Sequence, residues 1–477
     1  MYRNEGDESD HRYGIDGILN FQFKGGRDGS LDAGDKIFLY FGLRRGGTSY
    51  YGLDITDIDN PKLMWTKSAE DYPSMGQSWS RPYLKKVGVS GSTCMDGQSD
   101  CKDVVIISGG YDGGIPEQGG GGDDGISEDR DLAGGNKEVS DSTTDVRADR
   151  GNDILILDAL NGDLIWSTGA LGSQLNYSIP GGVRALDVNQ NELIDRMYFA
   201  DTGGNVWRLD LSESIGTSGA APSVLIKMAE LGGAGSDRRK FYNEPEVSTL
   251  RVDGRSVFTV SIGSGFRAHP LDTAIDDKFY ILVDDAPFTT LSSTTGNGFT
   301  TITEANLAGI TVNGTSATNT SSLNDVNKRG WVINFTQNGE KVLSPAFTFE
   351  GQVAFSTLVP EPSLSAANID QCAVPISQSN TYFFNLISGD LIEVINNDTS
   401  PGIANTIQPF FNEPEIITPD PDVVKISTDG KTLDANGNVV DACTHVVDLR
   451  KGTNSAEISG YDSCKIESVY WSDPVIE

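Results

Sequence analysis

At 477 residues, with 36 Lys and Arg against 68 Asp and Glu, the chain has a formal net charge of −32. Nucleic-acid binding requires clustered positive charge, so this balance argues against a DNA- or RNA-binding protein. No run of eighteen or more apolar residues occurs, so the sequence predicts no membrane-spanning helix.

Short β-rich runs separated by Gly, Asn and Asp recur along the chain, and helical periodicity is nearly absent. They include 36–43, 49–56, 104–110, 153–160, 205–211, 278–284 and 381–392. A repeated pattern of strand, Leu-Asp, turn and strand, often ending in Trp, is typical of a β-propeller. We therefore predict an all-β fold, a modified β-propeller with long irregular loop insertions, formed as one domain over residues 1–477.

The repeat also predicts what its residues do. Asn161-Gly162 between two apolar runs is a strong signal for a β-hairpin. We expect the Leu and Trp of the repeat to pack between blades, and its Asp to fix a turn instead of taking part in chemistry. Insertions interrupt the pattern at about 112–150, 286–327 and 396–440, and 361–380 is also expected to be irregular.

Residues 183–210 contain oxygen-bearing side chains at every second position. Asp187, Asn189, Asn191 and Asp195 match positions 1, 3, 5 and 9 of the EF-hand calcium loop. Leu193 stands at position 7, where that loop offers a backbone carbonyl. Because Ca²⁺ takes six to eight oxygen ligands, one short loop must supply several of them at this spacing. The sequence therefore predicts a Ca²⁺ site at these five residues.

Two positions depart from the EF-hand loop. Position 6 should be Gly and is Glu192, and position 12 should be Glu and is Tyr198. The residues that follow the loop, 196–200, have the pattern of a strand, so we predict a calcium loop set between two strands. Only two of its four side-chain ligands are charged, which predicts a weak site of the extracellular kind. A polar turn that binds no ion is the alternative.

Other motifs give weaker signals. The acidic glycine loop at 119–127 fits one copy of a calcium β-roll repeat, a fold that needs stacked copies, so a flexible loop is the default there. Asp210-x-Ser212-x-Ser214 fits an integrin-type metal motif without the alternating strands and helices of that fold, and we interpret it as chance. The three histidines are scattered and no nucleophile–base motif occurs, so we predict no enzymatic activity.

Five cysteines occur, none with C-x-x-C spacing. Cys94 and Cys101 flank a short loop and are predicted to form a local disulfide. Cys443 and Cys464 bracket a second candidate, which leaves Cys372 over. Disulfides would place the protein in an oxidising compartment, and buried free thiols are the alternative.

Several stretches resemble the PilY/PilC-type type IV pilus factors. They are Tyr177–Pro180 ahead of the Asp187–Asp195 loop, Tyr198–Asp210 after it, Tyr50–Thr56 with Gly76–Pro82, Gly263–Asp272, and Gly330–Phe335 with Glu340–Ser344. Together they run from about residue 37 to residue 395. The Asp-Thr-Gly-Gly-x-Val-Trp-Arg run beside a calcium loop is the most specific of them.

The resemblance implies a propeller of about seven blades that forms the C-terminal part of a longer secreted protein. It implies calcium ligands at Asp187, Asn189, Asn191, Leu193 and Asp195, with Ca²⁺ regulating pilus extension and retraction, twitching motility and surface attachment. It also implies export through the periplasm to the pilus tip or outer surface of a Gram-negative bacterium. The expected partners are minor pilins of the tip complex, and a host or abiotic surface bound through an N-terminal region. The opening residues lack a signal pattern, so a secreted chain would have lost its signal or be a fragment.

Two alternatives stay open. A quinoprotein dehydrogenase is also a propeller that uses Ca²⁺, and 158–166 fits its Asp-x-x-x-Gly-x-x-x-Trp turn, but the regular copies of that motif and a vicinal Cys pair are missing. An ion-free structural scaffold is the other. Absorbance of a bound quinone and titration with Ca²⁺ distinguish these alternatives from a calcium-binding pilus domain.

Overall fold

The structure, a computed structural model, describes residues 14–25, 34–89, 101–112 and 150–396, together with strand segments between 415 and 457. Within 150–396 the exceptions are 173, 213, 216–221, 234–237, 253, 268–269, 271, 291–298, 314–315, 320–327, 350 and 361–377. The interpretations of Cys94, Cys372, Cys443, Cys464, the three histidines and the 119–127 loop concern residues outside this description.

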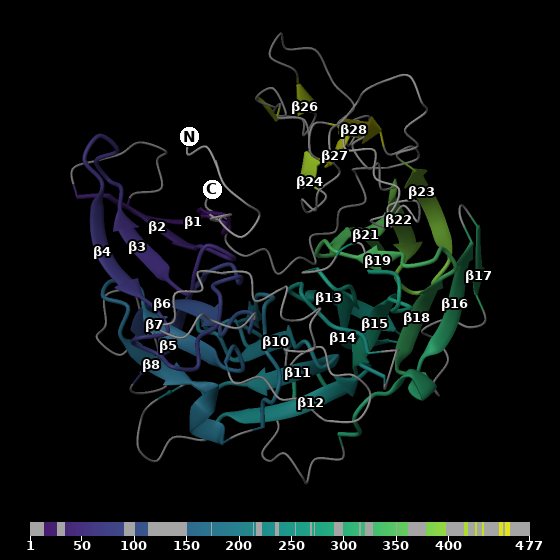
Figure 1. Cartoon of the computed structure of the whole chain (residues 1–477), viewed down its shortest axis with the longest axis horizontal. Coiled ribbons are helices and arrows are strands. Elements are labelled where there is room, and N and C mark those ends of the chain that lie inside the picture. Colours follow the sequence, from purple (N-terminus) through teal and green to yellow (C-terminus); the bar gives the residue numbers. More distant parts are fainter. Residues whose placement is uncertain are drawn as a thin grey trace, which may run out of the picture.

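Five sheets of four to six strands follow one another around a common centre (Figure 1). The first contains β1 (Asn20–Lys24), β2 (Lys36–Gly42), β3 (Tyr50–Asp54) and β4 (Lys62–Lys67). The second contains β5 (Tyr83–Gly88), β6 (Cys101–Ser108), β7 (Ile154–Asp158) and β8 (Leu164–Ser167). The third contains β9 (Arg184–Leu186), β10 (Arg196–Ala200), β11 (Asn205–Asp210) and β12 (Val224–Glu230).

The fourth and fifth sheets are larger. In spatial order the fourth contains β13 (Glu246–Val252), β14 (Arg255–Gly263), β15 (Lys278–Asp284), β18 (Gly330–Phe335), β16 (Ala308–Asn313) and β17 (Ser316–Asn319). The fifth contains β19 (Lys341–Val342), β21 (Gln352–Val359), β22 (Gln378–Asn385) and β23 (Leu391–Asn396), with β20 (Phe347–Phe349) paired to β21. Strand pairs are antiparallel in these five sheets, except that β16 is parallel to β18. The predicted all-β propeller class is confirmed, and these five sheets are the blades of four or more strands among the described residues. The expected number of about seven blades stays a prediction.

The chain after residue 396 adds only short strands among the residues described. They are β24 (Glu415–Ile417), β25 (Lys425–Ile426), β26 (Thr432–Leu433), β27 (Asp448–Lys451) and β28 (Asn454–Glu457). β24, β27 and β28 form one sheet, and β25 pairs with β26. That the whole of 1–477 is one domain stays a prediction.

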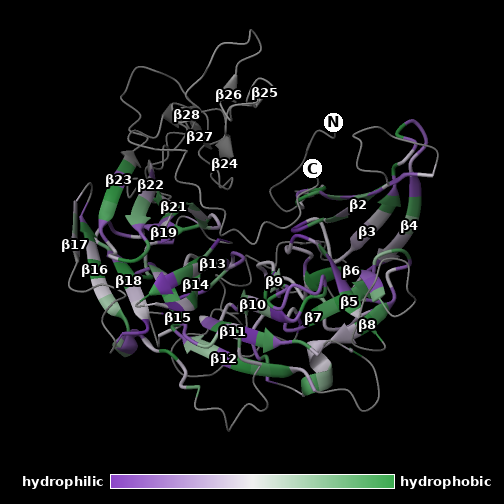
Figure 2. Ribbon diagram, turned by 180° about the vertical axis from the view of Figure 1, so that it is seen from behind, coloured by the Kyte–Doolittle hydropathy of each residue, from purple (hydrophilic) through white to green (hydrophobic). Residues whose placement is uncertain are grey.

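The hydrophobic core is distributed between neighbouring blades. In β6, Val104 and Ile106 pack toward the third blade, whereas Val105 and Ile107 pack toward the first. Successive side chains of a strand point to opposite faces, so a continuous apolar run buries both faces of a sheet. Residues 104–107 form such a continuous apolar run. In Figure 2 the hydrophobic colouring likewise extends along strands such as β12.

Tryptophans join adjacent blades as expected. The Trp65 indole N–H of the first blade donates to the Ala159 carbonyl of the second at 2.9 Å. Trp331 of the fourth blade donates to the Leu386 carbonyl, at the β22–β23 turn of the fifth, at 3.3 Å. The predicted Asn161-Gly162 hairpin joins β7 to β8, with Gly162 at a φ of 72° that glycine adopts without strain.

The expectation that 286–327 is an irregular insertion is wrong for 304–313 and 316–319. Residues 304–306 form a 3₁₀ turn, and β16 and β17 add a hairpin to the fourth sheet. Ala308, Ile310 and Val312 alternate with exposed or half-buried residues and lie in the core. This period of two was hidden by the surrounding Thr, Ser and Asn. The prediction for 361–380 also fails at its end, since β22 begins at Gln378.

Candidate calcium loop and buried ion network

The predicted calcium loop connects β9 to β10 in the third blade, between two strands as expected. Backbone hydrogen bonds fix the C-terminal end of the loop. The Asp195 amide donates to the Leu186 carbonyl at 3.0 Å, and the Asp195 carbonyl accepts from the Leu211 amide at 2.8 Å. The Ile194 amide donates to the Lys86 carbonyl of β5 at 3.1 Å. The loop is therefore fixed to its own sheet and to the second blade.

Three of the predicted ligands bond the backbone of the loop itself. The Asp187 carboxylate accepts from the amides of Asn191 at 3.1 Å and Glu192 at 2.7 Å. The Asn189 side-chain oxygen accepts from the Asn191 amide at 3.1 Å, and that of Asn191 accepts from the Leu193 amide at 3.0 Å. Carboxylate and carboxamide oxygens have further lone pairs, so these bonds leave capacity to bind a cation.

The Asp195 carboxylate closes the loop from its other end. Its oxygens accept from the amides of Val188 at 3.0 Å and Asn189 at 3.2 Å. Burial raises the pKa of Asp195, the two amide bonds oppose that rise, and the negative charge of Asp187 adds to it. The charge of Arg196 also opposes the rise. A cation bound between Asp187 and Asp195 would offset the repulsion of the two carboxylates.

The backbone of the loop turns sharply at two residues. Gln190 and Glu192 have φ values of 63° and 67°, in the left-handed region. Position 6 of an EF-hand loop is Gly because the chain turns sharply there, and here Glu192 makes that turn. Among the described residues no group of three or more His, Cys, Asp or Glu is placed to hold a metal. The loop, with two carboxylates and two carboxamides, is thus the candidate that the described chain offers.

Replacing Glu192 with glycine should stabilise the folded protein by about 0.5–1 kcal/mol, because a left-handed conformation costs a residue with a Cβ more than it costs glycine. The Lys86–Glu192 pair, 3.9 Å apart and largely exposed, contributes little. Urea unfolding measures the change. Glu192→Ala is the matched control, since it removes the same charge and keeps the Cβ; equal effects of the two variants would contradict the prediction.

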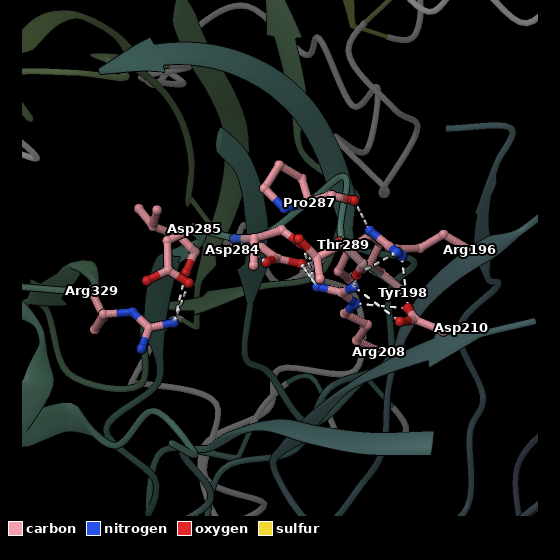
Figure 3. Close-up of polar contacts among 11 residues, drawn as sticks. Arg196, Tyr198, Arg208, Asp210, Asp284, Asp285, Pro287, Thr289 and Arg329 are labelled. Carbon is pink, nitrogen blue, oxygen red and sulfur yellow. Dashed lines mark hydrogen bonds and ion pairs between the residues drawn. The ribbon is translucent and has the colours of Figure 1, made fainter. Parts of the chain in front are cut away.

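A buried ion network begins at the residue after the loop (Figure 3). Arg196, Tyr198, Arg208, Asp210 and Asp284 are each at most 3% exposed. The Asp210 carboxylate accepts from Arg196 at 2.8 Å and from Arg208 at 2.8 and 3.0 Å. The Asp284 carboxylate accepts from Arg208 at 2.7 Å and from the Tyr198 hydroxyl at 2.6 Å. The two arginines and two aspartates balance in charge.

This network connects the third blade to the fourth. Asp284 ends β15, and the segment after it supplies carbonyls to both arginines. Arg196 donates to Pro287 and, at 3.2 Å, to Thr289, and Arg208 donates to Thr289 at 2.5 Å. Because Arg196 directly follows Asp195, the calcium loop and this contact between blades are adjacent in the chain.

The chain is similar in sequence to the type IV pilus biogenesis factor PilY1 of Pseudomonas aeruginosa. It is 26% identical over 198 residues to the proteins of strains PAO1 and PAK, a match that covers 39% of this chain and 13% of each relative. No family model matches. The crystal structure of the P. aeruginosa PilY1 C-terminal domain gives a TM-score of 0.56 at 15% identity, covering 96% of this chain and 86% of that one. The chain shares the fold of the PilY1 C-terminal domain.

The Asp-Thr-Gly-Gly-Asn-Val-Trp run forms the β10–β11 turn. The buried Asp201 carboxylate accepts from the amides of Gly203 and Asn205 at 3.0 Å each, from the Asn205 side chain, and from the Trp207 indole at 2.8 Å. Gly204 has a φ of 78°. The aspartate of this motif thus fixes a turn.

Stability should depend on pH through Asp201. Burial raises the pKa of Asp201 to about 6, although the hydrogen bonds from Trp207 and Asn205 act to lower it. The pKa of an aspartate in the unfolded chain is about 4. The stabilisation of the fold by protonated Asp201 is therefore complete below pH 4 and is lost as the pH rises through about 6. The difference in unfolding free energy between the parent and Asp201→Asn should therefore be about 1 kcal/mol larger at pH 5 than at pH 7.5. Urea unfolding at both pH values measures it, and an equal difference would contradict it.

The structure also bears on the integrin-type motif and on the predicted Cys94–Cys101 disulfide. Asp210 of the integrin-type motif is committed to Arg196 and Arg208, which agrees with interpreting that motif as chance. Cys101, the first residue of β6, is disulfide-bonded, and its predicted partner Cys94 lies outside the described residues. The signal of the ion network in the sequence is arginine and aspartate inside the otherwise apolar strands β10 and β11.

Proposed function

We propose that the chain is the Ca²⁺-binding domain of a type IV pilus biogenesis factor at the pilus tip or outer cell surface. Occupancy of the 187–195 loop regulates pilus extension and retraction, twitching motility and surface attachment. The observation that carries the proposal is the loop itself, whose carboxylates at Asp187 and Asp195 face one backbone turn. The likeness to PilY1 supports its place in the pilus system.

Four side chains and one carbonyl would hold the ion: Asp187, Asn189, Asn191 and Asp195, with the carbonyl of Leu193. Bound Ca²⁺ supplies positive charge where Asp187 and Asp195 repel each other. The loop amides orient these oxygens beforehand, which lowers the cost of ordering them when the ion binds. Two charged ligands correspond to affinity in the range of about 10⁻⁴–10⁻³ M, suited to extracellular calcium.

The partners are minor pilins of the tip complex, and a host or abiotic surface reached through the part of the full-length protein outside this chain. The match to the curated relatives spans 13% of their length. Among the described residues no helix is long and apolar enough to cross a membrane.

The proposal is tested in the encoding bacterium by replacing the chromosomal residue Asp195 with Ala and counting surface pili while measuring twitching across a calcium series. We expect pili that no longer respond to calcium, with normal amounts of the protein at the surface. Glu192→Ala, which removes an exposed carboxylate that is not a ligand, should respond like the parent. A calcium response that is unchanged in Asp195→Ala would overturn the proposal.

We also propose that the domain has no catalytic turnover. Several of its buried carboxylates are committed to structure: Asp201 to a turn, and Asp210 and Asp284 to arginines. An absorbance spectrum of the purified protein separates this from the quinoprotein alternative, because a bound quinone absorbs in the visible and near-ultraviolet. Dehydrogenase activity that follows such a chromophore would contradict the proposal.

A further inference from the structure

Three arginines from distant parts of the chain gather where several blades meet. Arg44 and Arg45 follow β2 of the first blade, and Arg267 follows β14 of the fourth. Arg267 donates to the Leu343 carbonyl, at the start of the fifth blade, at 3.0 Å. Trp79, which follows the first blade in the chain, lies 5.8 Å from Tyr242, which precedes the fourth, so the two blades approach each other here. We call Arg44, Arg45 and Arg267 the axial arginines.

Their positive charges act on one another. Burial and the charge of Arg44 lower the pKa of Arg267 to about 10, and Arg45 lowers it further, whereas Asp16 opposes the shift. Grouping like charges in this way costs free energy unless an anion accompanies them. It is also unexpected in a protein with a net charge of −32. The cluster therefore has the electrostatics of an anion site.

Two buried donors beside these arginines have no hydrogen-bond partner among the described residues. They are the Arg44 Nε and the Asn243 Nδ2. Asn243 is 4% exposed, and its Oδ1 accepts from Arg267 at 3.4 Å, so the free amide nitrogen lies next to that guanidinium. A buried donor without a partner costs about 1–3 kcal/mol. Arg44 also has a φ of 53°, a left-handed conformation that non-glycine residues keep mainly at functional sites.

One carboxylate of the chain already approaches the arginines. The Asp16 oxygen lies 3.9 Å from the Arg44 Nη1, with the Asp16 side chain 59% exposed. An exposed pair at this distance contributes little, so another carboxylate can replace it. The segment around Asp16 is packed closely on the 42–47 turn, since a Cβ on Gly46 would lie 2.2 Å from the Gly14 carbonyl oxygen. Asp16 thus indicates which chemistry the arginines accept.

Aromatic side chains lie beside the charges. The Arg45 guanidinium carbon is 5.9 Å from the centre of the Trp79 ring, which is 5.8 Å from Tyr242, and Tyr242 is 6.1 Å from Phe266. Guanidinium groups bind carboxylates through two parallel N–H bonds, and aromatic rings contact the organic body of a ligand. We propose that the axial arginines and Asn243 bind an organic carboxylate, which displaces Asp16 from Arg44.

The proposal is tested by calorimetric titration of the full chain, without calcium, with benzene-1,3,5-tricarboxylate and with hexaglutamate. We expect saturable binding of one or both, and the tighter ligand shows whether the carboxylate comes from a small molecule or an acidic peptide. Arg44→Gln should weaken binding about tenfold or more, the scale of a lost charge-assisted hydrogen bond. Asp16→Asn should tighten it about two- to fivefold, because an exposed ion pair contributes up to about 1 kcal/mol.

Arg255→Gln, at an exposed residue of β14, is the matched loss of positive charge and should leave binding unchanged. Tightening by Asp16→Asn separates a ligand site from a structural role, since a structural ion pair gives no such gain. The proposal is overturned if neither carboxylate binds the parent or Asp16→Asn, if Arg44→Gln binds as the parent does, or if inorganic phosphate binds and the carboxylates do not. Because calcium is absent, these outcomes are independent of the calcium loop.

Discussion

Asp284→Ala is expected to lower the free energy of unfolding by about 3–5 kcal/mol, the cost of breaking one side of a buried ion pair. The carboxylate is fully buried, and it accepts from Arg208 at 2.7 Å and from Tyr198 at 2.6 Å. Its removal leaves a buried guanidinium with one fewer anion and a buried hydroxyl without its acceptor. It also removes the side-chain contact that ties the third blade to the end of β15. Urea unfolding followed by tryptophan fluorescence measures the loss.

The next residue provides the matched control. Asp285 forms an ion pair with Arg329 at 3.4 Å, but its side chain is 51% exposed (Figure 3). Exposed pairs contribute about 0–1 kcal/mol, so Asp285→Ala should change stability by no more than that. A loss below 1 kcal/mol for Asp284→Ala, or equal losses for the two variants, would show that the network does not stabilise the contact between the blades.

Asp195→Ala is expected to abolish calcium binding and leave the domain folded. Asp187 and Asp195 are the two charged ligands of the loop, so one carboxylate would remain to offset dehydration of Ca²⁺. The loop joins β9 and β10 through backbone bonds that the substitution retains, including that of the Asp195 amide to Leu186. At a calcium concentration ten times the dissociation constant, binding should stabilise the parent by about 1.4 kcal/mol, and the variant by nothing.

Thermal unfolding with and without calcium measures this difference, and circular dichroism checks the fold. Glu192→Ala should keep the calcium-dependent increase in Tm. Asp195→Lys should imitate the bound state in part, because its ammonium group can lie among the remaining oxygens. Collapse of the whole fold in Asp195→Ala would show that the residue is structural beyond the loop.

Local patterns predicted much of this structure. The apolar run at 104–107 and the Asn161-Gly162 turn gave strands and a hairpin because strand burial and turn geometry depend on neighbouring residues. The period-two oxygens from Asp187 to Asp195 placed a loop between two strands for the same reason. The carboxylates of Asp187 and Asp195 accept from backbone amides of this loop, and the Ca²⁺ site there stays a prediction.

Contacts between distant residues were not predictable in this way. Arg208 and Asp284 are 76 positions apart, and Arg44 and Arg267 come from different blades, so no local period joins them. The 308–319 hairpin was missed because its apolar residues alternate within a stretch whose composition is typical of loops. Only the arrangement of the blades around a common centre brings these side chains together.

Calorimetric titration of the parent, Asp195→Ala and Asn189→Asp with CaCl₂ tests the calcium loop most directly. We predict one site in the parent with a dissociation constant of about 10⁻⁴–10⁻³ M. We predict tighter binding in Asn189→Asp, which adds a third carboxylate, and none in Asp195→Ala. Absence of binding in the parent, or equal affinity in the parent and Asp195→Ala, would contradict the assignment of this loop as the calcium site.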